Sequence, residues 1–196
     1  RAIAEDNERL VIHTSNFRKV KRVEDVLRVF EKIQKKIPSK LLLVGDGPER
    51  ANIEQLCREL DICDDVRFLG KQDASEELLS VGDLFVLPSE TERFGLAALE
   101  AMACQVPVIS TNTGGLPEVN VQGVTGFMSN VGDVDDMAKN SIFILEDSLR
   151  LLTFKKNALH HAMKFDLQNV LMHYENYYEK ILQLSRQQHS LGVNEG

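Results

Sequence analysis

The sequence predicts an α/β fold, a doubly wound, Rossmann-like parallel sheet, and two kinds of segment support this. Short apolar runs, most without strict apolar–polar alternation, are typical of strands covered on both faces. Longer stretches between them carry apolar residues every three or four positions, as amphipathic helices do. The runs predicted to be strands are 10–14, 41–44, 66–69, 84–87 and 107–110. Such alternation favours a parallel sheet, which binds ligands at the carboxyl ends of its strands.

The segments between these strands are predicted to be helices. In the first, apolar residues recur along one stripe from Val23 to Ile37. Pro48 is expected to open the second, because the first helical position does not need its N–H. A short third helix is expected at about 74–81, and a fourth at about 95–103.

Beyond the fifth strand the pattern changes. A glycine-rich loop leads to a short segment, Phe127–Met128, and helices are expected after it. The last strong helix carries a broad apolar stripe from Leu167 to Leu182, which packs either within this domain or onto a second lobe. The domain prediction is a linker or frayed end (1–9), one domain (10–184) and a disordered polar tail (185–196).

Size and charge exclude several classes of protein. The 196 residues suit one α/β domain, and a net charge of −7 argues against nucleic acid as the main partner. No stretch has the length and apolarity of a membrane span and no secretory signal is visible, so we expect a cytoplasmic location. The first residue is Arg1 rather than Met, which indicates a piece of a longer protein, natural or trimmed.

Cysteine and histidine show no metal-site spacing. The odd set of Cys57, Cys63 and Cys104 contains no Cys-x-x-Cys pair and is predicted to stay reduced. Without a cluster of ligands we expect no metal and no cofactor. Only His13 lies at a strand end near the predicted cleft, and the other histidines are treated as structural or surface residues.

One motif is similar to a dinucleotide fingerprint but departs from it. The segment 45–50 follows a strand and opens a helix, yet Arg50 stands where close helix–strand packing requires Gly or Ala. The next strand ends in Gly70-Lys71, without an acid for a ribose hydroxyl, which disfavours a dehydrogenase. Gly45 and Gly47 are still expected to let the backbone approach a ligand and to supply amides at a helix N-terminus.

The segment 88–102 is the most informative part of the sequence. It follows a strand and runs into a helix, so the amides of Phe94, Gly95 and Leu96 are expected to be donors without helical partners. Together with the helix dipole they form a cradle suited to a diphosphate. Glu92 lies just ahead of these amides, where it can accept hydrogen bonds from sugar hydroxyls. Glu100 lies roughly 7–8 Å further along the helix axis, where it can bind ribose hydroxyls.

A structural alternative stands beside this interpretation. On their own, Glu92 could be a capping acid and Glu100 an exposed helical residue, and two glutamates at this spacing are a weak signal. Other motifs in the same chain favour the functional interpretation. They are the segments 21–24, 44–48, 66–70, 88–89, 92–100, 107–110, 114–118 and 126–127.

In content and order these segments resemble the family 4 glycosyltransferases, retaining enzymes of the two-lobed GT-B fold. The resemblance covers essentially all of residues 10–184 and implies that the chain is the C-terminal, donor-binding lobe. It implies that Lys21 neutralises the donor diphosphate, that Glu100 binds ribose and that Glu92 contacts the donor sugar. It also implies that the segment 68–71, with Leu69, Gly70 and Lys71, forms the wall for the base.

Two positions depart from the family pattern. Asn16 stands where Arg is common, so Arg18 is expected to supply the second cation from a shifted position. Arg93 replaces the usual small residue before Phe94, and its role stays open between a surface side chain and a ligand contact. Catalysis is therefore assigned to Glu92, Lys21 and Arg18.

The resemblance also implies a substrate pair. Segments 15–22 and 97–104 carry a closer likeness within the family, which implies transfer from UDP-N-acetylglucosamine to L-malate in the full-length enzyme. The acceptor would be bound mainly by an N-terminal lobe, so the isolated fragment is expected to be inactive. Another transferase of the family, a UDP-sugar epimerase and a non-catalytic nucleotide-sugar binding module stay open as alternatives, as does a homo-oligomer.

Overall fold

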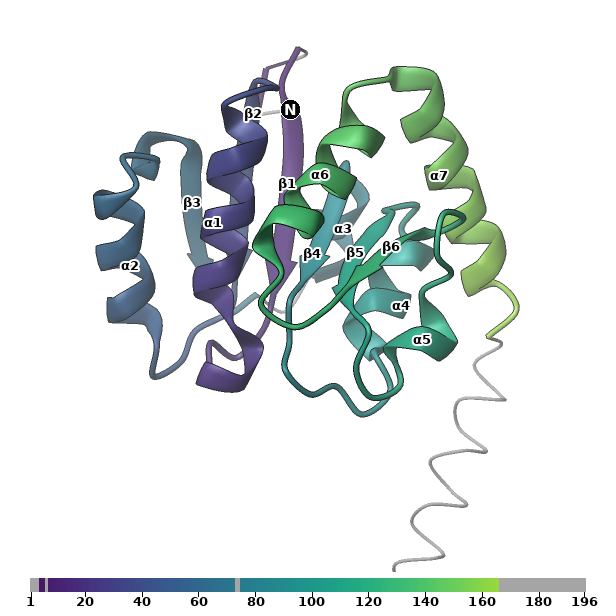
Figure 1. Cartoon of the computed structure of the whole chain (residues 1–196), viewed down its shortest axis with the longest axis horizontal. Coiled ribbons are helices and arrows are strands. Elements are labelled where there is room, and N and C mark those ends of the chain that lie inside the picture. Colours follow the sequence, from purple (N-terminus) through teal and green to yellow (C-terminus); the bar gives the residue numbers. More distant parts are fainter. Residues whose placement is uncertain (1–3, 6, 73–74, 166–196) are drawn as a thin grey trace, which may run out of the picture. The chain divides into compact units, whose positions relative to one another are not determined.

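The computed structural model describes residues 4–5, 7–72 and 75–165, and the chain divides into two units, 1–162 and 163–196. The first unit holds the fold (Figure 1). Its sheet has six strands in the order β3-β2-β1-β4-β5-β6, and every neighbouring pair is parallel. The predicted doubly wound parallel sheet is confirmed.

All five predicted strands are present, and the segment around Phe127 forms a sixth. The strands are β1 (Arg9–Thr14), β2 (Ser39–Val44), β3 (Val66–Gly70), β4 (Leu84–Leu87), β5 (Val108–Thr111) and β6 (Gly126–Ser129). The strand order reverses between β1 and β4, which pair directly with each other. At such a reversal the loops leave in opposite directions and open a crevice at the carboxyl ends, which is where α/β sheets bind ligands.

Helices cover both faces of the sheet. They are α1 (Val23–Gln34), α2 (Arg50–Glu59), α3 (Ser75–Ser80), α4 (Leu96–Ala103), α5 (Leu116–Val119), α6 (Val134–Leu145) and α7 (Ser148–Ala162). In Figure 1, α1 and α6 lie in front of the sheet, and α3 and α4 lie behind it. The apolar stripe of α1 is buried against Val11, Leu41 and Val86 of the strands, so its periodicity alone located the core face.

Two helix boundaries differ from the prediction. Pro48 lies in a turn, and α2 begins at Arg50, because the amide of Arg50 is bound by Gly47 O (3.1 Å) and closes that turn first. Gly95 precedes α4 as its N-cap with φ +80°, a conformation that a helix does not contain.

Some predictions lie outside the described residues. The apolar helix expected between Leu167 and Leu182 and the tail 185–196 belong to this part of the chain, and the domain limit at residue 184 stays a prediction. Among the helices in the described ranges, none has both the length and the apolarity needed to cross a membrane.

Candidate donor site at the carboxyl edge of the sheet

A cavity of ≈ 570 Å³ opens at the carboxyl ends of three strands. Thr14 ends β1, Val44 ends β2 and Leu87 ends β4, and all three line it. Four of the predicted site residues also line it: Lys21, Gly45, Lys71 and Glu92. The cavity therefore lies at the reversal of strand order, where the sequence placed the ligand.

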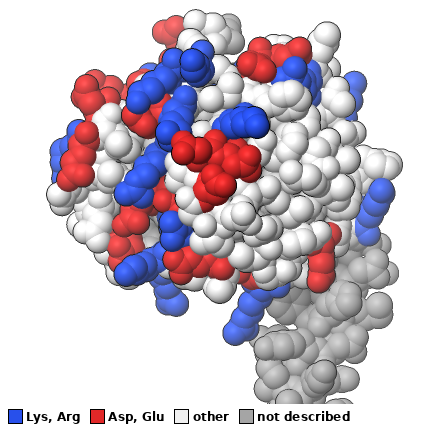
Figure 2. All heavy atoms as spheres, in the orientation of Figure 1, with Lys and Arg blue, Asp and Glu red and all other residues white. Residues whose placement is uncertain are grey.

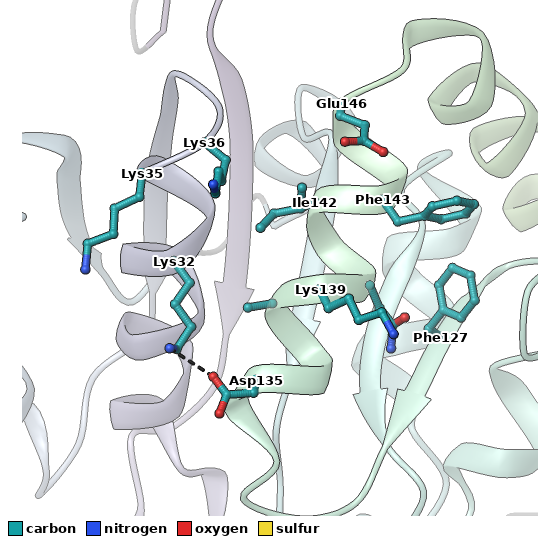
Figure 3. A pocket seen from close by; sticks show the side chains of 11 residues that line it. Lys32, Lys35, Lys36, Phe127, Asp135, Lys139, Ile142, Phe143 and Glu146 are labelled. Carbon is teal, nitrogen blue, oxygen red and sulfur yellow. Dashed lines mark ion pairs between the residues drawn. The ribbon is translucent and has the colours of Figure 1, made fainter.

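A larger cavity, of ≈ 740 Å³, lies elsewhere, between α1 and α6 (Figure 3). Lys32 and Lys139 lie on its wall, and Lys32 is paired with Asp135 (2.9 Å). On the face of the molecule seen in Figure 2, Lys and Arg are interspersed with Asp and Glu. This cavity contains none of the predicted site residues, and we do not assign the donor to it.

Lys21 and Glu92 meet across the carboxyl-edge cavity. Lys21 ends η1, a short 3-10 helix (Lys19–Lys21) after β1, and Glu92 lies in the loop after β4. The Nζ of Lys21 is 2.7 Å from Oε2 of Glu92, and the side chains are 22% and 17% exposed. Two residues far apart in sequence, both predicted to act on the donor, thus form one partly buried ion pair.

Further contacts fix the two loops that carry this pair. The amide of Glu90 donates to Val20 O (2.9 Å), and Nη1 of Arg22 donates to Oε1 of Glu90 (3.1 Å). Arg22 is itself held by Asp25, a buried residue of α1 (2.6 Å). The Asp25 carboxylate and the Glu90 carboxylate both raise the pKa of Arg22. The loop after β4 is therefore anchored beside η1 independently of Glu92.

The first turn of α4 begins with backbone amides that have no partner in the helix. Within the described part of the chain, the amides of Gly95 and Leu96 find no hydrogen-bond acceptor. Ala97, in the same turn, lines the cavity. Unsatisfied donors at a helix N-terminus can bind a diphosphate, and ligand binding by these amides, and by that of Phe94 beside them, stays a prediction.

Gly114 and Gly115 support the Glu92 loop from behind. A Cβ on Gly114, which has φ +56°, would lie 1.7 Å from Glu92 O, and one on Gly115 would lie 2.5 Å from Arg93 O. The amide of Gly115 donates to Glu92 O (3.0 Å). These glycines let one loop pack directly on another.

Gly45 and Gly47 also let one loop pack closely on another. A Cβ on Gly45 would lie 1.8 Å from Ser15 O, and one on Gly47 would lie 1.9 Å from Asn16 O. The close approach that the structure shows for these glycines is to the protein's own loop after β1, and their approach to a ligand stays a prediction. Gly45 still lines the cavity, whereas Gly47 is not part of its lining.

Glu100 lies one turn of α4 beyond Ala97, so the two are on the same side of the helix. Its side chain is partly exposed. Partial burial and, second, the nearby carboxylate of Glu76 raise the pKa of Glu100 above its usual range. The residue lies outside the cavity lining itself, so its predicted contact with ribose stays a prediction.

The residues predicted for the base wall lie at or near the cavity, whereas the predicted second cation, Arg18, does not line it. Lys71 lines the cavity, and Gly70 contributes its carbonyl to the amide of Gly45 (2.7 Å). Leu69 precedes them at the end of β3 and is half-buried. Arg18 is exposed, and its side chain has no hydrogen bond or ion pair within the described ranges. The structure thus brings Lys71 to the cavity but leaves Arg18 outside it.

His13 has a structural role that the sequence did not reveal. It is fully buried, with Nδ1 2.8 Å from Val86 O and Nε2 2.8 Å from Oγ of Ser15. A carbonyl only accepts, so Nδ1 carries the proton and Nε2 accepts from the Ser15 hydroxyl. Burial lowers the pKa of His13 from 6.5 to about 4, and the Lys21 charge adds to this. His13 is therefore neutral at pH 7 and orients Ser15, which lines the cavity.

Comparisons with known proteins agree with this site. The family model for glycosyl transferases group 1 matches residues 2–161. The N-acetyl-alpha-D-glucosaminyl L-malate synthase of Bacillus anthracis is 47% identical over 178 residues, which are 90% of this chain and 47% of that protein. A sulfoquinovosyl transferase of Arabidopsis thaliana is 32% identical over 168 residues, 83% of this chain and 31% of that protein.

Solved structures share the fold. The Anabaena protein HepE, crystallised with UDP, superposes with a TM-score of 0.79 at 25% identity, over 89% of this chain and 49% of that one. The solved structures that superpose on this chain are GT-B glycosyltransferases. The chain spans less than half the length of these relatives.

Proposed function

Because the chain belongs to the glycosyl transferases group 1 family, we propose that its carboxyl-edge cavity binds the UDP-sugar donor of a retaining glycosyltransferase. One observation carries the proposal. The Lys21–Glu92 ion pair lines the cavity at the reversal of strand order, and the helix that begins with the open amides of Gly95–Leu96 reaches the same cavity at Ala97. A relative that was solved with UDP supports a uridine nucleotide as the ligand.

Each group has a distinct task in the proposed complex. The diphosphate lies on the amides of Phe94, Gly95 and Leu96, and Lys21 neutralises its charge. Glu100 accepts hydrogen bonds from the ribose hydroxyls, Glu92 from the sugar hydroxyls, and the segment with Leu69, Gly70 and Lys71 borders the base. Arg18 is the second cation and would have to turn inward to reach the diphosphate.

The transfer step needs no nucleophile from this lobe. As the bond from the anomeric carbon to the phosphate oxygen breaks, negative charge grows on the leaving diphosphate, where Lys21 and the amides stabilise it. The acceptor attacks from the same face, and the leaving phosphate takes its proton. No metal ion takes part in this scheme.

The substrates follow from the relatives. The Bacillus anthracis protein supports UDP-N-acetylglucosamine as donor and L-malate as acceptor in the full-length enzyme. Most of the acceptor site belongs to a second lobe in this proposal, so the 196-residue chain binds donor but shows no turnover. A cytoplasmic location and a homo-oligomer remain predictions.

Nucleotide binding by two variants tests the site. We expect UDP, but neither GDP nor ADP, to raise the melting temperature of the chain. Glu100→Gln weakens UDP binding by about tenfold, because a charged acceptor of two hydroxyls is lost. Lys21→Ala weakens it by a similar factor. The measurement is isothermal titration calorimetry.

The matched control for these variants is Glu59→Gln, which changes an exposed glutamate on α2. It is expected to bind UDP like the wild type. Unchanged affinity in both Glu100→Gln and Lys21→Ala would place the nucleotide elsewhere.

A further inference from the structure

The Lys21–Glu92 ion pair occupies the place where the proposed donor has to bind. Both side chains line the carboxyl-edge cavity, and each is the other's partner at 2.7 Å. In the proposed complex, however, Lys21 contacts the diphosphate and Glu92 contacts the sugar. The two side chains therefore exchange partners when the donor enters.

We propose that Glu92 competes with the nucleotide diphosphate for Lys21, and that it thereby makes the lobe favour the intact sugar nucleotide over the free nucleoside diphosphate. This inference rests on the proposed function and gives Glu92 a second task at the same site. The competing groups are of one kind, because a carboxylate and a phosphate both accept hydrogen bonds from an ammonium group.

A UDP-sugar and free UDP differ in the hydrogen bonds that they offer to the Glu92 carboxylate once it has left Lys21. A UDP-sugar separates the pair but offers its sugar hydroxyls to the released carboxylate. Free UDP separates the pair and leaves the Glu92 carboxylate without a partner, close to the charges of the diphosphate. After transfer, the same carboxylate is expected to return to Lys21 and to promote release of UDP.

The anchored loop makes a side-chain exchange sufficient. The loop after β4 keeps its contacts through Glu90 N to Val20 O, Arg22 to Glu90 and Gly115 N to Glu92 O. None of these contacts involves the Glu92 carboxylate. Glu92 can thus leave Lys21 by rotating its side chain, while the amides of Gly95 and Leu96 stay in position.

The test compares UDP and UDP-N-acetylglucosamine on the 196-residue chain by calorimetry. We expect Glu92→Gln to tighten UDP by about threefold, the scale of one partly exposed ion pair, and to leave UDP-N-acetylglucosamine unchanged or weaker. In a Lys21→Met background the same change is expected to tighten UDP less, because only the repulsion between Glu92 and the diphosphate is then relieved, while the competition needs Lys21.

The matched control is Glu90→Gln, which removes the charge of the other paired carboxylate of this loop; its amide oxygen can still accept from Arg22 and keep the loop anchored, so neither affinity is expected to change. Should Glu92→Gln not fold, Glu92→Ala gives the same comparison. The competition is refuted, and the donor site stands, if the wild type binds both nucleotides but Glu92→Gln binds UDP no more tightly than the wild type does. It is refuted equally if Glu92→Gln tightens UDP by the same factor in the Lys21→Met background as in the wild type. If the wild type binds neither nucleotide, the proposed function itself fails, and the competition with it.

Discussion

Gly114→Ala is expected to destabilise the protein by about 3 kcal/mol and to weaken UDP binding by about tenfold. Gly114 has φ +56°, and an added Cβ would lie 1.7 Å from Glu92 O. An alanine in the left-handed region costs about 1 kcal/mol, and relieving the overlap costs about 1–3 kcal/mol more. The overlap is with backbone, so no side-chain rotation relieves it and the Glu92 loop has to shift.

The shift explains the expected effect on binding. The Glu92 loop leads directly to the amides of Gly95 and Leu96, so a displaced loop misplaces at least one donor to the diphosphate. A hydrogen bond to a charged group contributes about 1.5 kcal/mol, which corresponds to about tenfold in affinity. Urea unfolding measures the stability change, and calorimetry measures the affinity change.

Gly123 offers a matched control. It also has a positive φ, +72°, but the nearest atom to its added Cβ is on the Phe127 ring at 4.0 Å. Gly123→Ala is therefore expected to cost about 1 kcal/mol and to leave UDP binding unchanged. Equal losses of stability in both variants would show that backbone conformation alone, and not the contact with the Glu92 loop, explains the requirement for glycine.

Acidification from pH 6.5 to pH 4 is expected to remove about 3 kcal/mol of stability through His13 alone. Burial lowers the pKa of His13 to about 4 from 6.5. Between these values the unfolded state binds a proton that the folded state does not, so stability rises with pH. The contribution is complete above pH 6.5 and is lost as the pH falls towards 4.

His13→Asn isolates this contribution. The asparagine amide can still donate to Val86 O but does not titrate in this range. The variant is expected to be less stable than the wild type at pH 7, and the difference is expected to shrink as the pH falls. Unfolding by urea at several pH values measures it, with His160→Asn on α7 as the control for loss of an exposed imidazole. A constant difference from pH 7 to pH 4 would contradict a neutral, buried His13.

Local pattern was sufficient for the fold class and for part of the site. Apolar runs such as Leu84–Leu87 and the stripe of α1 predicted the parallel sheet. A strand that is buried on both faces has apolar residues at consecutive positions, and such a run can be recognised in the sequence alone. The amides of Gly95 and Leu96 were predictable too, because every helix start leaves donors without partners. The start of α2 did not follow from local pattern, because a turn hydrogen bond at Gly47 decides where the helix begins.

The sequence by itself determined which residue types are candidates for binding a diphosphate sugar and on which loops they lie. Only the tertiary structure decided that Lys21 and Glu92, 71 residues apart, form a pair, that Gly45 and Gly114 serve contacts between loops, and that His13 is neutral beneath Ser15. The physical reason is the same in each case. These properties depend on distances between atoms of different loops, and such distances are set by the packing of the whole sheet rather than by any neighbouring residue in the chain.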